Sequence, residues 1–419
     1  MTRENAPAAA GEEHNAALRG WEKNAALFIA SQTLSLFGSA LVQYAMSWQV
    51  LLGTKSGSMM TVSVLCGFLP AFFLSPFAGV WADRYDRKCI IMLADGFIAL
   101  VTLALALLFS AGYDSLVFLF AAMALRAVGT GLHSPAMNAL VPELIPANSL
   151  TRVQAINSTL QSVVTLLSPM LSAALLGFLP IQSIFYIDVV TASAAILILL
   201  FLVKAPKRFR PAEASAKGYF EDMAAGLRYV KEHGFIKAFF AFTVVFQFFA
   251  APAAFLTPLQ TARTFGEELW RLSAIEVAFS VGMIGGGLLI AAWGGFKNKV
   301  HSMAAAFIGV GAGTALLGVG VPFWLYLAFM AVIGISLTTF STPAMVLLQQ
   351  RVEPEFHGRI FSVMAMISSA VMPLGMLVFG PLADVASIEL MLIGTGVIYI
   401  AESVILLKNR PLLEAGKPL

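Results

Sequence analysis

Long apolar stretches of this 419-residue chain contain several ionisable residues, among them Arg126, Asp188, Asp95, Glu402 and His133. A charged side chain in an apolar environment costs several kcal/mol, so each is a candidate for a functional role. The chemistry that such residues offer is proton binding and release, by a carboxylate or imidazole alone or by an ion pair that opens and closes.

Arg126 and Asp188 lie at comparable depths within two of these stretches. Arg126 is about ten residues into one apolar run and Asp188 about seven into another, which are similar distances at a rise of about 1.5 Å per residue. We expect the two to pair, because a buried charge without a partner is unfavourable. The sequence leaves open whether the pair is structural or opens with proton binding.

Asp95, Glu402 and His133 each allow a second interpretation. Asp95 and Glu402 lie near the ends of apolar runs, so either carboxylate could extend to water. His133 titrates in the range that proton coupling needs, yet a single histidine on a helix can also be a structural residue with satisfied hydrogen bonds.

The overall composition indicates a membrane protein. The chain is 59% hydrophobic and 12% charged, whereas a soluble domain has about 25% charged residues. A soluble chain of this composition would expose large apolar patches, but in a bilayer lipid is the solvent. We therefore expect an all-α integral membrane protein.

Twelve stretches reach the roughly 20 apolar residues that a membrane span needs. They lie near 25–52, 59–82, 89–111, 115–140, 151–178, 181–203, 236–262, 272–295, 301–320, 322–348, 358–384 and 387–407. This predicts a tail over 1–24, a six-helix bundle over 25–203, a linker with an amphipathic helix over 204–235, a second bundle over 236–407 and a tail over 408–419.

The distribution of basic residues predicts the orientation. If the N-terminus is cytoplasmic, only Lys55, Arg263 and Arg271 of the 26 Lys and Arg residues fall in outer loops, and only Arg126 falls deep within a span. Lys and Arg concentrate on the cytoplasmic side of membrane proteins. We expect both termini to be cytoplasmic, and the net charge of +3 to reflect orientation with no nucleic-acid partner.

The turn between the second and third spans, GVWADRYDRK (79–88), is unusually charged. Arg84, Arg87 and Lys88 suit a cytoplasmic turn, but the positive-inside rule does not require Asp83 or Asp86. Gly79, one turn before Asp83, predicts a close helix contact.

An internal repeat relates the two sets of six spans. SPAM at 134–137 and TPAM at 342–345 lie 208 residues apart, close to half the chain length, and Pro169 and Pro373 follow in the next span of each half. Repeated six-span halves are typical of secondary transporters.

The charged turn resembles the loop signature of the major facilitator superfamily, G-x-x-x-D-R-x-G-R-K, with Asp86 in place of the second glycine. The resemblance implies two pseudo-symmetric six-helix bundles and alternating access. It also implies that Asp83 closes the cytoplasmic side by bonding to the start of the eleventh span, near Arg359. The predicted gating residues are Gly79, Asp83, Arg84, Asp86, Arg87, Lys88 and Arg359.

Longer segments, among them GFLPAFFLSPFAGVWADRYDRK, resemble bacterial macrolide-efflux members of that family. TLLSPMLSA (165–173) is similar to a degenerate form of the span-five motif of drug antiporters, with Ser168, Ser172 and Ala173 in place of glycines. Pro169 within it would bend the helix.

By the same resemblance, the first, fourth, seventh and tenth spans surround a central cavity. Aromatic and amide residues on three of them form the predicted substrate-binding set: Gln43, Tyr44, Trp48, Phe242, Phe246, Gln247, Phe249 and Phe340. Such a lining suits large, amphipathic, mostly apolar ligands.

We therefore expect a secondary active exporter of hydrophobic or amphipathic compounds, of the macrolide or multidrug type, using proton antiport. It would be a monomer in the bacterial cytoplasmic membrane, contacting lipid and substrate, with no cofactor or metal and the proton gradient as energy source. The alternatives are a lipid or siderophore exporter, or a non-transporting receptor or scaffold. An ATP-driven pump or an enzyme is not expected, because no G-x-x-x-x-G-K-[ST] motif occurs and the five histidines are scattered.

Overall fold

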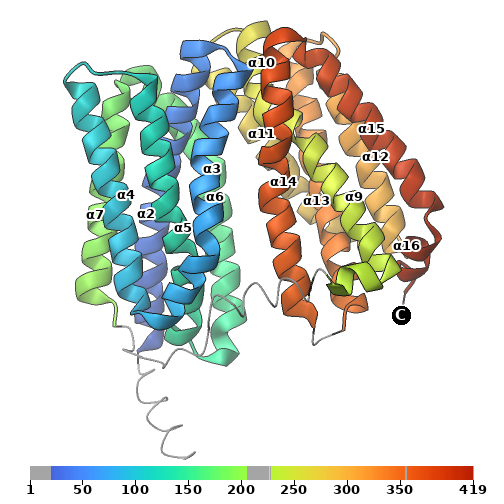
Figure 1. Cartoon of the computed structure of the whole chain (residues 1–419), viewed down its shortest axis with the longest axis horizontal. Helices are drawn as coiled ribbons and strands as arrows, with labels where there is room; N and C mark the ends of the chain where they lie inside the picture. The colour runs from blue at the N-terminus through green and yellow to red at the C-terminus, as the bar shows by residue number, and fades with distance from the viewer. Residues whose placement is uncertain (1–19, 205–225, 227, 354–355, 419) are drawn as a thin grey trace, which may run out of the picture. The chain divides into compact units, whose positions relative to one another are not determined.

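The computed structural model describes residues 20–204, 226, 228–353 and 356–418 and is almost entirely helical over these ranges (Figure 1). Twelve helical stretches in the described part are long and apolar enough to cross a bilayer, which confirms the predicted number. No strand occurs in these ranges. The helix-only architecture follows from the solvent, because each backbone N–H and C=O in lipid must be satisfied within its own segment.

The six predicted spans of the first half match six helices to within a few residues. These are α2 (Trp21–Thr54), α3 (Gly57–Arg84), α4 (Arg87–Ser110), α5 (Leu116–Leu144), α6 (Ala147–Phe178) and α7 (Ile181–Leu202).

The second half repeats this series with one interruption. The predicted span at 236–262 consists of α9 (Gly234–Ala251), a π-helical turn η1 (Pro252–Leu256) and α10 (Thr257–Thr264). Pro252 has no N–H to donate, which favours local unwinding of the helix. The remaining helices are α11 (Leu269–Trp293), α12 (Lys299–Leu317), α13 (Phe323–Arg351), α14 (His357–Val385), α15 (Ile388–Lys408) and the short α16 (Arg410–Ala415).

The repeated motifs occupy corresponding helices. Pro135 lies inside α5 and Pro343 inside α13, the fourth and tenth spans. Pro169 and Pro373 lie inside α6 and α14, the fifth and eleventh. The sequence repeat is therefore also a repeat of helix order.

Contacts between Cα atoms divide the chain into two compact units. The N-terminal unit comprises Met1–Met46 and Cys66–Ala216, and the C-terminal unit comprises Ser47–Leu65 and Lys217–Leu419. The facing ends of α2 and α3 thus group with the second half of the chain. The domain boundaries predicted from the sequence stay a prediction.

Glycines allow close helix packing in the C-terminal unit. A Cβ at Gly334 of α13 would overlap the carbonyl oxygen of Phe279 on α11, and a Cβ at Gly282 of α11 would overlap that of Ala331 on α13. Such small residues let helix backbones approach each other in a membrane.

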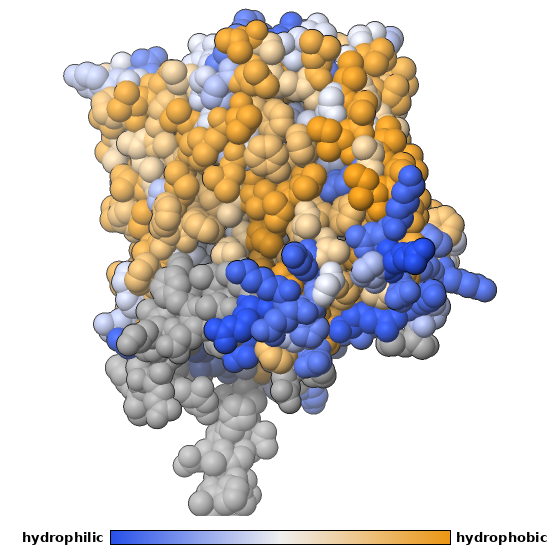
Figure 2. All heavy atoms as spheres, turned by 45° about the vertical axis from the view of Figure 1, so that its right-hand side comes forward, coloured by the Kyte–Doolittle hydropathy of each residue, from blue (hydrophilic) through white to orange (hydrophobic). Residues whose placement is uncertain are grey.

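The lateral surface is apolar. On the face drawn in Figure 2, hydrophobic side chains cover the middle of the helices, and hydrophilic ones gather near the helix ends. Large apolar residues such as Phe178, Phe201 and Trp324 are mostly exposed, as expected for contact with lipid. The predicted amphipathic helix after the sixth span falls largely outside the described residues, although 228–232 are helical.

Candidate functional site

The expected pair between Arg126 and Asp188 is present in the N-terminal unit. Nη1 of Arg126 on α5 lies 2.5 Å from Oδ2 of Asp188 on α7. Arg126 is 5% exposed and Asp188 is fully buried. An ion pair at this burial is held in place by its further hydrogen bonds, because each charge has lost its hydration shell.

Side chains from α2 and α4 complete the surroundings of this pair. The Ser39 hydroxyl donates to Oδ1 of Asp188 over 3.2 Å, and the Ser39 carbonyl oxygen accepts from Nη2 of Arg126 over 3.2 Å. Thr102 Oγ1 lies 3.0 Å from Oδ2 of Asp188 and also accepts from Arg126. Gly38 makes the approach of α2 possible, since a Cβ there would overlap the Thr191 hydroxyl.

A second polar cluster lies in the same unit and links α2, α4 and α5. Nε2 of His133 lies 3.5 Å from Oδ1 of Asp95 and 2.7 Å from Oε1 of Gln32. The Ser35 hydroxyl donates to Oδ1 of Asp95 over 3.1 Å. Oδ2 of Asp95 is buried and has no hydrogen-bond partner among the described residues. With one carboxylate oxygen unsatisfied, Asp95 has a place for a proton beside a histidine.

Four residues of these clusters were not predicted from the sequence: Gln32, Ser35, Ser39 and Thr102. Gln32, Ser35 and Ser39 follow the i, i+3, i+7 spacing of one helix face. This polar stripe within an apolar run was the available signal. Thr102 offered none, because an isolated threonine commonly bonds to its own helix backbone, as Thr102 also does with Ile98.

Glu402 stands apart from both clusters. It lies on α15 in the C-terminal unit, is 5% exposed, and neither carboxylate oxygen has a hydrogen-bond partner among the described residues. The interpretation that Asp95 and Glu402 extend to water is wrong for this structure, since Asp95 is only 3% exposed. Helix packing covers both carboxylates before their short side chains reach the surface.

The charged turn fastens the ends of neighbouring helices. Asp86 is the N-cap of α4 and accepts from the backbone N–H of Cys89 over 3.1 Å. Lys88 donates to the carbonyl oxygens of Leu200 and Val203, at the end of α7, over 3.2 and 2.9 Å. A cation at a helix C-terminus is favourable because the last carbonyl groups carry partial negative charge.

Arg87 joins the same turn to α5. Its Nε donates to the Ala82 carbonyl oxygen over 2.9 Å, and its Nη1 donates to that of Ala139 over 2.6 Å and pairs with Glu143 at 3.1 Å. Arg84 lies exposed in the last turn of α3. These contacts of Asp86, Arg87 and Lys88 lie within the N-terminal unit, and the gating role expected for the three residues stays a prediction.

Two further gating predictions have different outcomes. A Cβ at Gly79 would meet no described atom within 4 Å, so the close helix contact expected there is not present in the part that the structure describes. An open position at the exposed end of a helix does not require glycine. The side chain of Asp83 lies outside the described residues, and the guanidinium of Arg359 lies 5.5 Å from the ring centre of Phe356. The role of Asp83 stays a prediction.

A carboxylate that the sequence did not single out forms an extensive contact in the C-terminal unit. Asp384, near the end of α14, accepts from the Gly57 and Ser58 N–H groups over 2.6 and 2.9 Å and from the Ser56 hydroxyl over 2.9 Å. These donors form the N-terminus of α3, where a negative charge is favoured. Nη2 of Arg263 lies 3.5 Å from the same carboxylate.

The predicted substrate-binding residues differ in how much of each side chain is exposed. Trp48, Phe246 and Phe340 are buried, and the rings of the last two are tilted against each other with 4.9 Å between their centres. Half-buried positions are occupied by Tyr44, Phe242, Gln247 and Phe249, and Gln43 is exposed. Whether any of these residues contacts substrate stays a prediction.

Among the described residues, no group of three or more His, Cys, Asp or Glu side chains could hold a metal ion. What the arrangement offers chemically is a buried ion pair and a carboxylate–imidazole cluster.

Comparisons with known proteins agree with this arrangement. The family model described as the Major Facilitator Superfamily matches residues 27–376. Macrolide efflux protein A of Streptococcus pyogenes is 29% identical over 379 residues, covering 89% of this chain and 93% of that protein. Macrolide efflux protein A of Enterococcus faecalis is 30% identical over 326 residues, covering 76% and 100%.

A D-xylose-proton symporter of known structure shares the fold, with a TM-score of 0.70 at 12% identity over 94% of this chain and 99% of the symporter. The family match spans most of the chain and includes every residue of both polar clusters. It ends within α14, so the end of α14 and all of α15 and α16 lie outside it. On this match, and with the twelve spans, the chain belongs to the Major Facilitator Superfamily.

Proposed function

We propose that this protein is a secondary active exporter of hydrophobic and amphipathic compounds, of the macrolide or multidrug type, driven by proton antiport. It works by alternating access in the bacterial cytoplasmic membrane, with both termini in the cytoplasm. Similarity to two macrolide efflux proteins along most of the chain supports the substrate class. The positions of Lys and Arg support the orientation.

The buried pair of Arg126 and Asp188 is the observation that carries the coupling proposal. A proton arriving at Asp188 removes its charge and leaves the guanidinium of Arg126 without a counter-ion. The guanidinium then favours a conformation in which it finds another partner or water. Proton binding and helix rearrangement are coupled in this way, because neither charge is stable alone in an apolar interior.

Asp95 and His133 provide a second proton-binding position in the same unit. Their oxygen and nitrogen lie 3.5 Å apart, and serine and glutamine side chains hold both in place. The two clusters both use α2, α4 and α5, so a shift of α2 changes both sites together. This arrangement suits a transporter that passes a proton between buried groups during one cycle.

Drug accumulation in cells tests the proposal. Cells that express the wild-type chain should accumulate less macrolide than control cells, and an uncoupler should abolish the difference. Asp188→Asn and Arg126→Ala should accumulate macrolide as control cells do. Glu267→Gln is the matched control, since Glu267 forms an exposed ion pair with Lys55 and its loss should not matter.

Proteoliposomes separate the proposal from its alternatives. An imposed pH gradient should drive macrolide uptake into inverted vesicles, and substrate addition should move protons. Export that ignores both the uncoupler and the two substitutions would rule out the coupling site. A receptor or scaffold would show no flux, and a lipid or siderophore exporter would move those compounds and leave macrolides behind.

A further inference from the structure

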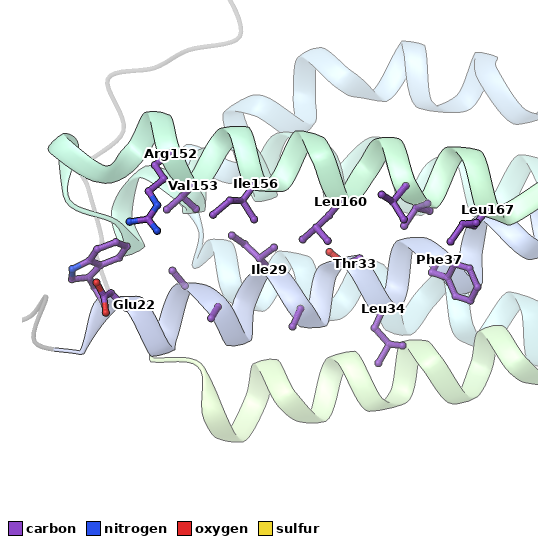
Figure 3. A pocket seen from close by; sticks show the side chains of 16 residues that line it. Glu22, Ile29, Thr33, Leu34, Phe37, Arg152, Val153, Ile156, Leu160 and Leu167 are labelled. Atoms are coloured by element: carbon purple, nitrogen blue, oxygen red, sulfur yellow. The ribbon is translucent and has the colours of Figure 1, made fainter. Parts of the chain in front are cut away.

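A long groove between α2 and α6 of the N-terminal unit is not used by the proposed coupling site. Its volume is about 770 Å³, within the range of small-molecule sites. Figure 3 shows the groove running along the two helices, with Glu22 and Arg152 at one end and Leu167 and Phe37 toward the other. From residue 22 to 37 of α2 the groove extends about 22 Å at 1.5 Å per residue.

The walls of the groove are apolar except for Thr33, midway along α2, and the charged residues at one end. Ala30 and Leu34 of α2 and Leu160 of α6 are typical of the lining, and the charged lining residues are Glu22 and Arg152 alone. A carboxylate and a guanidinium at the mouth of an apolar groove match a ligand that has both a negative and a positive group on a long apolar tail.

Several polar residues of α6 lie on a face away from the groove, so the groove is unsuitable for a polar substrate. Exposed Ser158, Gln161, Ser162 and Thr165 form a stripe more than a quarter-turn away from Leu160 on the helical wheel. α6 therefore presents hydroxyl and amide groups on one face and, apart from Arg152 at the mouth, only apolar side chains to the groove. A water-filled passage would follow the polar stripe, whereas the groove suits a hydrocarbon chain.

We propose that this groove binds a membrane phospholipid with a zwitterionic ethanolamine head group. The Arg152 guanidinium binds the phosphate in charge-assisted hydrogen bonds. The Glu22 carboxylate accepts from the primary ammonium, which has three N–H donors. The acyl chain lies between α2 and α6, and the groove is longer than the roughly 15 Å of one leaflet of the hydrocarbon core.

Trp21 at the same end supports this position for the head group. It lines the groove and directly precedes Glu22 in the chain, and tryptophan is enriched where the hydrocarbon core meets the head groups. In the proposed orientation this end is cytoplasmic, so the bound lipid comes from the inner leaflet.

Lipid retention by the purified full-length protein tests the proposal. The wild type is incubated with phosphatidylethanolamine, phosphatidylcholine or phosphatidylglycerol of identical acyl chains, and bound lipid is counted by native mass spectrometry. Ethanolamine lipid should be retained about tenfold more tightly than the other two, because choline has no N–H donor and glycerol no positive charge. Equal retention of the three lipids would overturn the proposal.

Variants test which group of the lipid head each charged residue contacts. Glu22→Gln should remove the preference for ethanolamine over choline, and Arg152→Gln should weaken all three lipids. Lys23→Gln, at the neighbouring position of α2 but outside the groove lining, should change nothing. Ala30→Trp should displace every lipid by filling the groove, with size-exclusion chromatography verifying its fold.

If a macrolide displaced all three lipids from the wild type equally, the groove would be a substrate site and the proposal would be overturned. The same holds if Glu22→Gln keeps the ethanolamine preference. These measurements involve no transport, so their failure leaves the exporter proposal unaffected.

Discussion

The two halves of the repeat have different residues at the equivalent buried position of their fourth helix. Eight residues before the SPAM motif of α5 stands Arg126, which pairs with a buried carboxylate. Eight residues before the TPAM motif of α13 stands Gly334, which packs directly on the backbone of α11. Equivalent positions thus hold an ion pair in the N-terminal unit and a backbone contact in the C-terminal unit.

The same contrast extends to the surroundings of these positions. The interior of the N-terminal unit holds Asp95, His133 and their polar neighbours, whereas that of the C-terminal unit holds an aromatic cluster. Phe246 lies 5.2 Å from Phe307, 4.9 Å from Phe340 and 5.2 Å from Tyr399, measured between ring centres. A repeated fold can therefore keep the chemistry in one half and rigid packing in the other.

The largest effect should come from removing one member of the ion pair. Asp188→Asn leaves the Arg126 charge buried without a counter-ion, which should lower the free energy of unfolding by about 3–5 kcal/mol. The protein should still insert but lose proton-coupled export. Thermal unfolding in detergent and uptake driven by a pH gradient measure the two effects.

The double variant Arg126→Met with Asp188→Leu sharpens this result. Replacing a buried pair by apolar side chains of similar size restores stability in other proteins, so unfolding should return toward wild type while coupling stays lost. If the double variant transported with normal coupling, the chemistry would not depend on this pair.

Truncating the aromatic cluster should destabilise the protein without altering coupling. Phe246 is buried, and Phe246→Ala should cost about 3–5 kcal/mol through lost burial and the cavity left behind. The fraction that folds should exchange protons and substrate in the normal ratio. A changed ratio in proteoliposomes would indicate that the C-terminal interior takes part in the coupling chemistry.

A smaller loss is expected at the repeat-equivalent position Gly334. Gly334→Ala places a Cβ against the Phe279 carbonyl and should cost about 1–3 kcal/mol by overpacking. Gly394→Ala is the control, since a Cβ at Gly394 meets no described atom within 4 Å. Thermal unfolding of both variants decides whether α11 and α13 need a glycine at this contact; equal stability would mean that they do not.

The smallest effect should come from Glu402→Gln. This change removes the ionisable carboxyl group and keeps the size, and no cation pairs with Glu402 among the described residues. Export and proton coupling should stay within about twofold of wild type, which is below 0.5 kcal/mol. Loss of coupling would show that the C-terminal half also carries proton chemistry and would end the contrast drawn above.

Much of the fold could be predicted because the bilayer imposes a simple rule on the sequence. Each span needs about 20 apolar residues, so α4 and α7 were located to within two residues at each end. The pairing of Arg126 with Asp188 was also predictable, because few partners exist for a charge at that depth. Span length does not report local unwinding, so η1 at Pro252 was missed.

The other hydrogen-bond partners could not be predicted from the sequence, since they depend on which helices lie side by side. Gln32, Ser35 and Ser39 form a polar stripe in the sequence and Thr102 gives no signal, but the partners of all four follow from the packing of α2 and α4 against α5 and α7. Asp384 likewise looked like a residue at a span end, until the fold placed the N-terminus of α3 against it.

Composition and hydropathy alone determined that this chain is a twelve-span membrane protein with ionisable residues inside its apolar spans, because hydropathy is a local property that each segment carries with it. The tertiary structure alone decided which polar groups meet, which carboxylates stay without a partner and where an apolar groove opens. These depend on distances between helices far apart in the chain, and no segment encodes such distances by itself.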